Sequence, residues 1–199
     1  MTRNIGIVLD PVFEEREAIG PFEVFGMMSK IDPEWRVVTI AQQAGPVPSL
    51  SRLKVVADHS FDDAPALDVI LLPGGLGSRK AMDDPQMIDF VRKAGEKAGW
   101  VTSVCTGAML LHRAGFLYGR RATTHWGAIW ELRSLGDVEV LEDARWVVDG
   151  NVVTSAGVSA GIDMALYLVS LLKDASTARA VQKMMEYYPK PPTFEEAHA

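Results

Sequence analysis

The feature that most constrains the fold is a regular alternation of short apolar runs with longer amphipathic segments. The runs at residues 69–72 and 100–104 contain no charged side chain, as expected for central strands of a parallel sheet that is covered on both faces. Neighbouring parallel strands need a crossover connection, which is usually a helix, so this alternation indicates βαβ units. We therefore predict an α/β fold with a doubly wound, mostly parallel sheet and helices on both faces.

The pattern also gives the expected elements and the domain organisation. The expected strands are residues 5–9, 36–40, 69–72, 100–104 and 152–155, and the expected helices are residues 85–98, 106–114, 160–172 and 176–187. A pair of β-rich runs at residues 138–141 and 145–149 predicts a hairpin or small β-ribbon. With 199 residues, we expect one domain over residues 1–188 and an extended tail over residues 189–199.

Composition excludes several classes of function. The 20 basic and 26 acidic residues give a net charge of −6, which argues against a nucleic-acid partner, since such proteins usually carry a basic stripe. No apolar stretch approaches the roughly 20 residues of a membrane span, and the first residues lack the apolar region of a signal peptide. A single cysteine rules out an internal disulfide and a multi-thiolate metal site. We expect a cytoplasmic protein that binds no membrane.

The clearest candidate for chemistry is Cys105, the only cysteine, which directly follows the predicted strand 100–104. Gly107 lets the backbone turn sharply into the next helix. A thiol at a helix N-terminus is stabilised as the thiolate, the nucleophilic form, by the helix dipole and the free N–H groups. The alternative is that Cys105 only fills space, as free cysteines often do. The strand–Cys–x–Gly–helix context favours a nucleophile.

A second junction, P-G-G-L-G at residues 73–77, also follows a predicted central strand. Glycines there let backbone N–H groups approach a ligand, so Gly74 and Gly75 are candidates for an anion nest or oxyanion hole. The glycine spacing matches neither a dinucleotide-binding fingerprint nor a phosphate-binding loop. A tight turn that needs positive φ is the structural alternative.

A third junction, G-V-S-A-G at residues 157–161, matches the pattern of a serine-hydrolase nucleophile elbow. A triad would need an acid and then a histidine after Ser159, and only His198 follows, in the predicted tail. We therefore reject a serine hydrolase. We expect the small residues to let this helix start approach the site, where the N–H of Val158 or Ser159 is a candidate donor.

Two further polar residues are candidates. Glu17 lies in the expected loop over residues 10–20, just before an apolar helix start that would draw it inward, where its carboxyl could orient or deprotonate a group beside Cys105. His125, in the string A-T-T-H-W, lies near a strand end. A histidine in such a place is either a hydrogen-bonded structural residue or a contact to substrate.

Taken together, these junctions resemble the ThiJ/PfpI family of the class I glutamine-amidotransferase-like superfamily, and within it the isocyanide hydratases. The matching stretches cover nearly the whole chain: residues 19–24, 68–75, 101–107, 121–126, 160–163 and 186–192. The strings V-T-S-V-C-T-G and R-A-T-T-H-W are the most specific of these, whereas P-G-G is shared by many relatives.

The resemblance implies a flavodoxin-like fold and a homodimer. It implies that Cys105 is the nucleophile, that Glu17 is the carboxyl hydrogen-bonded to it, and that Gly75 and Thr106 provide backbone donors. Thr106 would also offer a hydroxyl, and Val158 would lie near the substrate.

The function expected from this resemblance is a cysteine-dependent lyase that hydrates a small electrophilic molecule. The best candidate is an isocyanide, converted to an N-substituted formamide through a covalent thioimidate at Cys105, with no metal or organic cofactor. Thr106 stands where the PfpI peptidases carry histidine, which argues against a peptidase.

Alternatives remain open because isocyanide hydratases carry aspartate where this chain has Glu17. Glutamate is typical of the deglycase-like and redox-sensing members of the family. A redox or stress sensor would use reversible oxidation of Cys105, and a glyoxalase- or deglycase-like enzyme would act on carbonyls. A ligand-sensing domain is a further possibility, although the chain has no helix-turn-helix segment to bind DNA.

Overall fold

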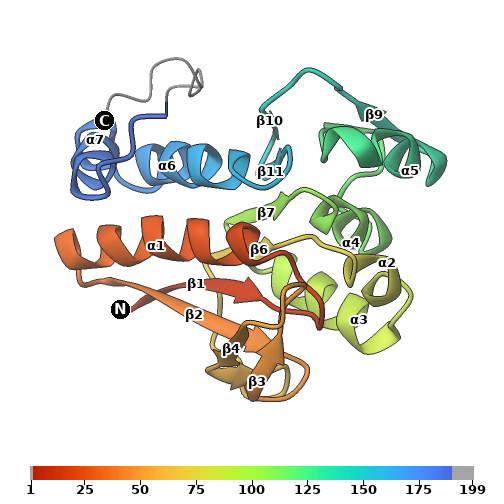
Figure 1. Ribbon diagram of the computed structural model, residues 1–199, viewed down its shortest axis with the longest axis horizontal. Helices are drawn as coiled ribbons and strands as arrows, with labels where there is room; N and C mark the ends of the chain where they lie inside the picture. Colours follow the sequence, from red (N-terminus) through yellow and green to blue (C-terminus); the bar gives the residue numbers. More distant parts are fainter. Residues whose placement is uncertain (1, 190–199) are drawn as a thin grey trace, which may run out of the picture.

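A seven-stranded sheet forms the centre of the computed structural model, which describes residues 2–189 (Figure 1). The strand order is β10-β11-β7-β6-β1-β2-β5, and all neighbours are parallel except β10 with β11. The strands are β1 (Arg3–Val8), β2 (Trp35–Ala41), β5 (His59–Ser60), β6 (Val69–Leu72), β7 (Trp100–Val104), β10 (Trp146–Asp149) and β11 (Val152–Ser155). The predicted mostly parallel α/β sheet is confirmed.

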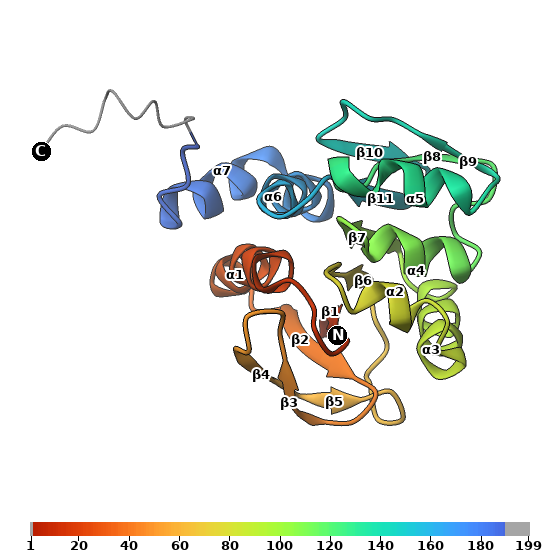
Figure 2. The ribbon, with the colours of Figure 1, turned by 45° about the vertical axis from the view of Figure 1, so that its right-hand side comes forward.

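Helices cover both faces of this sheet (Figure 2). One layer consists of α1 (Glu15–Ile31), α6 (Ala160–Leu172) and α7 (Ala175–Met184); the other contains α2 (Ser78–Ala81), α3 (Pro85–Gly95), α4 (Gly107–Arg113) and α5 (Ile129–Ser134), with a 3-10 turn, η1 (Trp126–Ala128), before α5. Successive residues of β6 contribute alternately to the two layers: Val69 and Leu71 pack under α1 and α6, whereas Ile70 and Leu72 pack under α3 and α4. A strand buried on both faces therefore needs an unbroken apolar run.

The strand order also determines where a site can form. Strand β1 lies between β2 and β6, so the connections leave β1 and β6 in opposite directions. Loops splay apart at such a switch point, and ligands of open α/β sheets bind there, outside the carboxyl ends of the strands. The loops that follow β1, β6, β7 and β11 all lie at this edge.

The predicted β-ribbon over residues 138–149 is wrong in its pairing. Strand β9 (Val138–Val140) pairs in parallel with β8 (Arg120–Ala122), and β10 instead forms a hairpin with β11. The reason is the two-residue turn at Gly150 and Asn151, where Gly150 adopts a φ of 62°. Glycine adopts such a φ without strain, and a glycine at the first of two turn residues is a hairpin signal.

A small antiparallel ribbon does exist, formed by β3 (Gly45–Pro48) and β4 (Lys54–Ala57). This ribbon was not predicted because Pro46 and Pro48 argue against a strand. Both prolines are tolerated here on a short two-stranded ribbon at the margin of the molecule.

Several helix ends differ from the predictions: α3, for example, ends at Gly95 rather than at residue 98. Helix α1 begins at Glu15, within the expected loop over residues 10–20, so Glu17 lies in its first turn and Pro21 lies inside the helix. Helix α7 covers Ala175–Met184, capped by the Asp174 side chain, and ends before residue 187. Asp84 caps the N-terminus of α3, since its carboxylate accepts the Gln86 N–H at 2.9 Å. The predicted tail lies outside the described residues beyond Pro189.

Candidate active site

Cys105 occupies a sharp turn between β7 and α4. Its φ is 57°, a conformation that side-chain-bearing residues rarely adopt, and its side chain is largely buried. The Cys105 N–H donates to the Ser155 carbonyl at 3.0 Å, which ties the turn to the end of β11. A Cβ added to Gly107 would lie 2.1 Å from the Leu72 carbonyl oxygen, so only glycine allows the helix to start this close to β6.

Glu17 is fully buried beside Cys105, and two backbone N–H groups hold its carboxylate. Gly74 donates to Oε2 at 2.8 Å and Val158 donates to Oε1 at 3.1 Å. The carboxyl also interacts with the Cys105 thiol. Burial raises the pKa of Glu17 to about 7, although these three hydrogen bonds partly oppose the rise. Glu17 can therefore exchange a proton near neutral pH.

The same burial acts on the thiol. The pKa of Cys105 is raised, first by loss of hydration and then by the charge and hydrogen bond of Glu17, while the backbone and side chain of Thr106 act in the opposite direction. The Glu17 contribution depends on its ionisation, because a protonated carboxyl no longer repels a thiolate. Cys105 and Glu17 therefore behave as a pair that shares one proton, rather than as the independent thiolate expected from the helix N-terminus.

Thr106 and Gly75 are hydrogen-bonded to each other. The Gly75 N–H donates to Thr106 Oγ1 at 2.9 Å, and Thr106 Oγ1 lies 3.0 Å from the Gly75 carbonyl. Ser78, which sequence analysis did not identify, completes the cluster with its hydroxyl 2.7 Å from Thr106 Oγ1. The Gly75 N–H and the Thr106 hydroxyl thus link the 74–77 loop to the cysteine turn. Since the Gly74 and Val158 N–H groups bind Glu17, these two residues position the carboxyl.

The third junction meets the site through Val158. Its φ of 52° is unusual for a β-branched residue and directs its N–H toward Glu17. A Cβ on Gly157 would lie 2.1 Å from His125 Cδ2, so glycine lets the imidazole pack against this loop. His125 Nδ1 accepts the Gly127 N–H at 3.1 Å. Ser159 lies 3.4 Å from Arg145 Nη2, and among the described residues Val158 rather than Ser159 lines the pocket.

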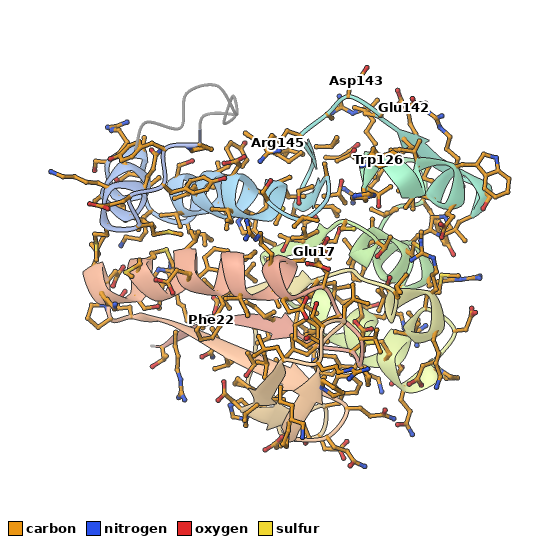
Figure 3. All side chains as sticks on the ribbon, in the orientation of Figure 1. Glu17, Phe22, Trp126, Glu142, Asp143 and Arg145 are labelled. Carbon is orange, nitrogen blue, oxygen red and sulfur yellow. The ribbon has the colours of Figure 1, made fainter. Side chains whose placement is uncertain are left out.

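A pocket of about 310 Å³ opens above Cys105. Its walls include Glu17, Gly75, Thr106, His125 and Val158, and its mouth carries three exposed apolar side chains that sequence analysis did not single out: Leu50, Leu76 and Trp126. Figure 3 shows Glu17 at the end of α1 nearest β6. The pocket accommodates a small molecule with an apolar body.

A larger pocket of about 910 Å³ lies at the carboxyl ends of β1 and β2, away from Cys105. Asp10 lines it, and its Oδ2 is buried without a hydrogen-bond partner. Burial raises the pKa of Asp10 to about 7, and the nearby charge of Glu17 adds to the rise. Size alone does not make this pocket the site, because neither Cys105 nor Glu17 lines it.

Within residues 2–189, no three histidine, cysteine or acidic side chains are grouped to hold a metal ion, and no helix there is long and apolar enough to cross a membrane.

Two features define the class of protein: the order of the strands in the sheet, and a positive-φ cysteine that lies beside the buried carboxyl of Glu17. Together they are typical of flavodoxin-like α/β proteins with a cysteine at a sharp strand-to-helix turn. The chain belongs to the DJ-1/PfpI family, whose model matches residues 3–171. The predicted resemblance is therefore confirmed.

The chain is similar to several individual proteins of this family. The chain is 41% identical over 192 residues to an isonitrile hydratase of Pseudomonas putida, covering 96% of this chain and 82% of the relative. It is 31% identical over 182 residues to the Parkinson disease protein 7 homolog of Danio rerio, covering 88% and 93%. Among solved structures, a ThiJ/PfpI family protein from Pseudomonas syringae superposes with a TM-score of 0.89 at 33% identity, covering 99% of this chain and 80% of the other.

Proposed function

We propose that the protein is a cysteine-dependent hydratase that converts an isocyanide to an N-substituted formamide. The observation that carries the proposal is the pairing of Cys105 with a buried Glu17 whose pKa is about 7. Such a carboxyl can take up the thiol proton and return it within one catalytic cycle near neutral pH. The identity of 41% to an isonitrile hydratase supports the substrate class.

In the first step, the sulfur of Cys105 attacks the terminal carbon of R–N≡C. The thiol proton passes through Glu17 to the same carbon, so one S–C bond and one C–H bond form, and the product is the thioimidate R–N=CH–S–Cys105. The Thr106 N–H, which interacts with the sulfur, stabilises negative charge there during proton transfer.

In the second step, water adds to the thioimidate carbon. Glu17 takes a proton from the water and the nitrogen gains one. The C–S bond then breaks, and the sulfur recovers its proton as R–NH–CHO leaves. One water is consumed, nothing is oxidised or reduced, and the chemistry calls for no metal or organic cofactor. Val158 and His125 are the proposed substrate contacts, with the Gly75 N–H holding the Thr106 hydroxyl beside the pocket.

The test is formamide production from cyclohexyl isocyanide by the wild type and by Cys105→Ala and Cys105→Ser. We expect turnover by the wild type and none by either variant, with a thioimidate adduct on wild-type Cys105 visible by intact mass. Turnover by Cys105→Ala at a substantial fraction of the wild-type rate would refute the mechanism. A folded wild type that never consumes isocyanides would refute the substrate class.

A second candidate is redox sensing or carbonyl chemistry at Cys105, and the observation that favours it is the glutamate at position 17 together with the 31% identity to the Danio rerio protein. A stable gain of two oxygens on Cys105 after mild peroxide treatment would support redox sensing. Consumption of glyoxal-type carbonyls would support the carbonyl alternative.

We also propose that the protein is a cytoplasmic homodimer acting on a small molecule. Ile19 and Phe22 lie on α1 as exposed apolar side chains, of which Figure 3 labels Phe22. A second copy of the chain would bury them. The cytoplasm would keep the single thiol reduced. Light scattering should give twice the chain mass, and Phe22→Asp should reduce it; a concentrated monomer would refute the dimer.

A further inference from the structure

Thr124 is a buried residue outside the pocket that contacts the backbone of the cysteine turn. It follows β8 and is almost inaccessible to solvent. Its hydroxyl donates to the Cys105 carbonyl at 2.7 Å, across 19 residues of sequence. The same carbonyl also accepts the Ala108 N–H at 3.2 Å, a longer contact within the start of α4. The hydrogen bond from the Thr124 hydroxyl is thus the shorter of these two bonds to the Cys105 carbonyl.

The Cys105 carbonyl matters because it shares a peptide plane with the Thr106 N–H. A trans peptide is planar, and its C=O and N–H point in opposite directions. Any group that fixes the direction of the Cys105 carbonyl therefore also fixes the direction of the Thr106 N–H. The Thr106 backbone favours the thiolate form of Cys105 and acts to lower the pKa of the thiol.

The turn needs such a restraint because it is strained. Cys105 holds a φ of 57°, and residues in this region keep their conformation only when surrounding contacts impose it. The Cys105 N–H is held by Ser155, which secures the peptide before the cysteine. Thr124 secures the peptide after it.

We propose that Thr124 is a positioning residue that aims the Thr106 N–H at the sulfur of Cys105, and so keeps the thiol reactive. The inference rests on the proposed function for its consequence in turnover, but it concerns the reactivity of the thiol itself. Removing one such donor elsewhere has cost about 10²- to 10³-fold in rate. A donor that is misdirected rather than deleted should cost about tenfold or more.

The chain supplies a matched control one residue away. Thr123 is also fully buried, and its hydroxyl donates to the Leu141 carbonyl at 2.8 Å. Thr123→Val therefore removes a buried threonine hydroxyl bond from the same segment without touching the cysteine turn. Thr124→Ser keeps the hydroxyl. Thr124→Val removes the hydroxyl and keeps a similar side-chain volume, whereas Thr124→Ala removes the hydroxyl and also reduces the side-chain volume.

The first measurement is the rate at which iodoacetamide alkylates the folded protein, followed by intact mass between pH 6 and pH 10. Cys105 is the only cysteine, so this rate reports on it alone. We expect Thr124→Val and Thr124→Ala to react about tenfold more slowly at neutral pH, with the pH profile moved upward. Thr124→Ser should remain within about threefold of the wild type, and Thr123→Val should match the wild type while its melting temperature falls as much as that of Thr124→Val.

The second measurement is the hydration of cyclohexyl isocyanide, for which kcat should fall in Thr124→Val with KM unchanged. Equal alkylation rates and pH profiles in Thr124→Val and the wild type would overturn the proposal, and so would an equal slowing in Thr123→Val. If the wild type does not hydrate isocyanides, the proposed substrate fails, whereas the alkylation series still decides the role of Thr124. If Thr124→Val does not fold, Thr124→Ala against Thr124→Ser decides it.

Discussion

The buried carboxyl of Asp10 should make the protein less stable as the pH rises, and Asp10→Asn should remove this effect. In the structure, Asp10 Oδ2 has no hydrogen-bond partner, and a Cβ placed on Gly77 would meet both this oxygen, at 2.1 Å, and the Pro11 carbonyl oxygen, at 2.0 Å. Two oxygens therefore face the same small space. A proton on the carboxyl, or the NH₂ of asparagine, relieves their repulsion.

The magnitude follows from the pKa. Burial raises the pKa of Asp10 from 3.8 to about 7, so the native state binds more protons than the unfolded chain across this range. Stability must then fall as the pH rises through the window from 3.8 to about 7. At about 1.4 kcal/mol per pKa unit, the loss between pH 4 and pH 8 is about 4 kcal/mol. That is a large part of the 5–15 kcal/mol that holds a typical domain together.

The assay is denaturant unfolding of the wild type and Asp10→Asn at pH 4.5, 6 and 8. Glu17 titrates in the same range and its charge acts on Asp10, so the difference between the two proteins reports Asp10 together with its coupling to Glu17. We expect the variant to be more stable by about 4 kcal/mol at pH 8 and by about 1 kcal/mol at pH 4.5. Asp143→Asn, at an exposed position, should change stability by less than about 0.5 kcal/mol at every pH. Parallel pH curves for the wild type and Asp10→Asn, or a less stable variant at pH 8, would refute the reasoning.

Three further variants test the site. Glu17→Gln should lower the pKa of Cys105 by removing a negative charge, so alkylation at pH 8 should be faster while isocyanide turnover is lost; slower alkylation would contradict the shared-proton pair. Gly107→Ala should destabilise the fold by about 3 kcal/mol in denaturant unfolding, because its Cβ would lie 2.1 Å from the Leu72 carbonyl oxygen. Trp126→Ala should raise KM for bulky isocyanides and change stability by less than about 0.5 kcal/mol, since the indole is 82% exposed at the pocket mouth; an unchanged KM would remove it from the site.

The central sheet was predictable because its signals are local. Strand β6 is apolar at every position, and the bounds predicted for β6, β7 and β11 are those observed. The pairing of β10 was not predicted, because two β-rich runs separated by a short polar segment resemble a hairpin until the Gly150–Asn151 turn is recognised as the stronger signal. The ribbon of β3 and β4 was hidden by its prolines.

The site was predictable only in part. Cys105 and Glu17 stand out by residue type and by the junctions that carry them, and the structure brings them together. Ser78 reaches the Thr106 hydroxyl and Thr124 reaches the Cys105 carbonyl, and no local pattern shows where a serine or threonine hydroxyl will find its acceptor. The roles of the Gly74 and Val158 N–H groups likewise depend on where Glu17 lies in three dimensions.

The hydrogen bonds of Glu17 have a consequence for how the molecule is assembled. They join it to residues 57 and 141 positions further along the chain, so the carboxyl acquires its partners only after β6 and β11 have both joined the sheet. Contacts of such long range form late, because the chain must first close large loops. During synthesis and refolding, Cys105 therefore passes through a period as an ordinary accessible thiol before its carboxyl neighbour is in place. Pulsed alkylation of this one sulfur would time the last step of folding, since its chemistry changes when the sheet is complete.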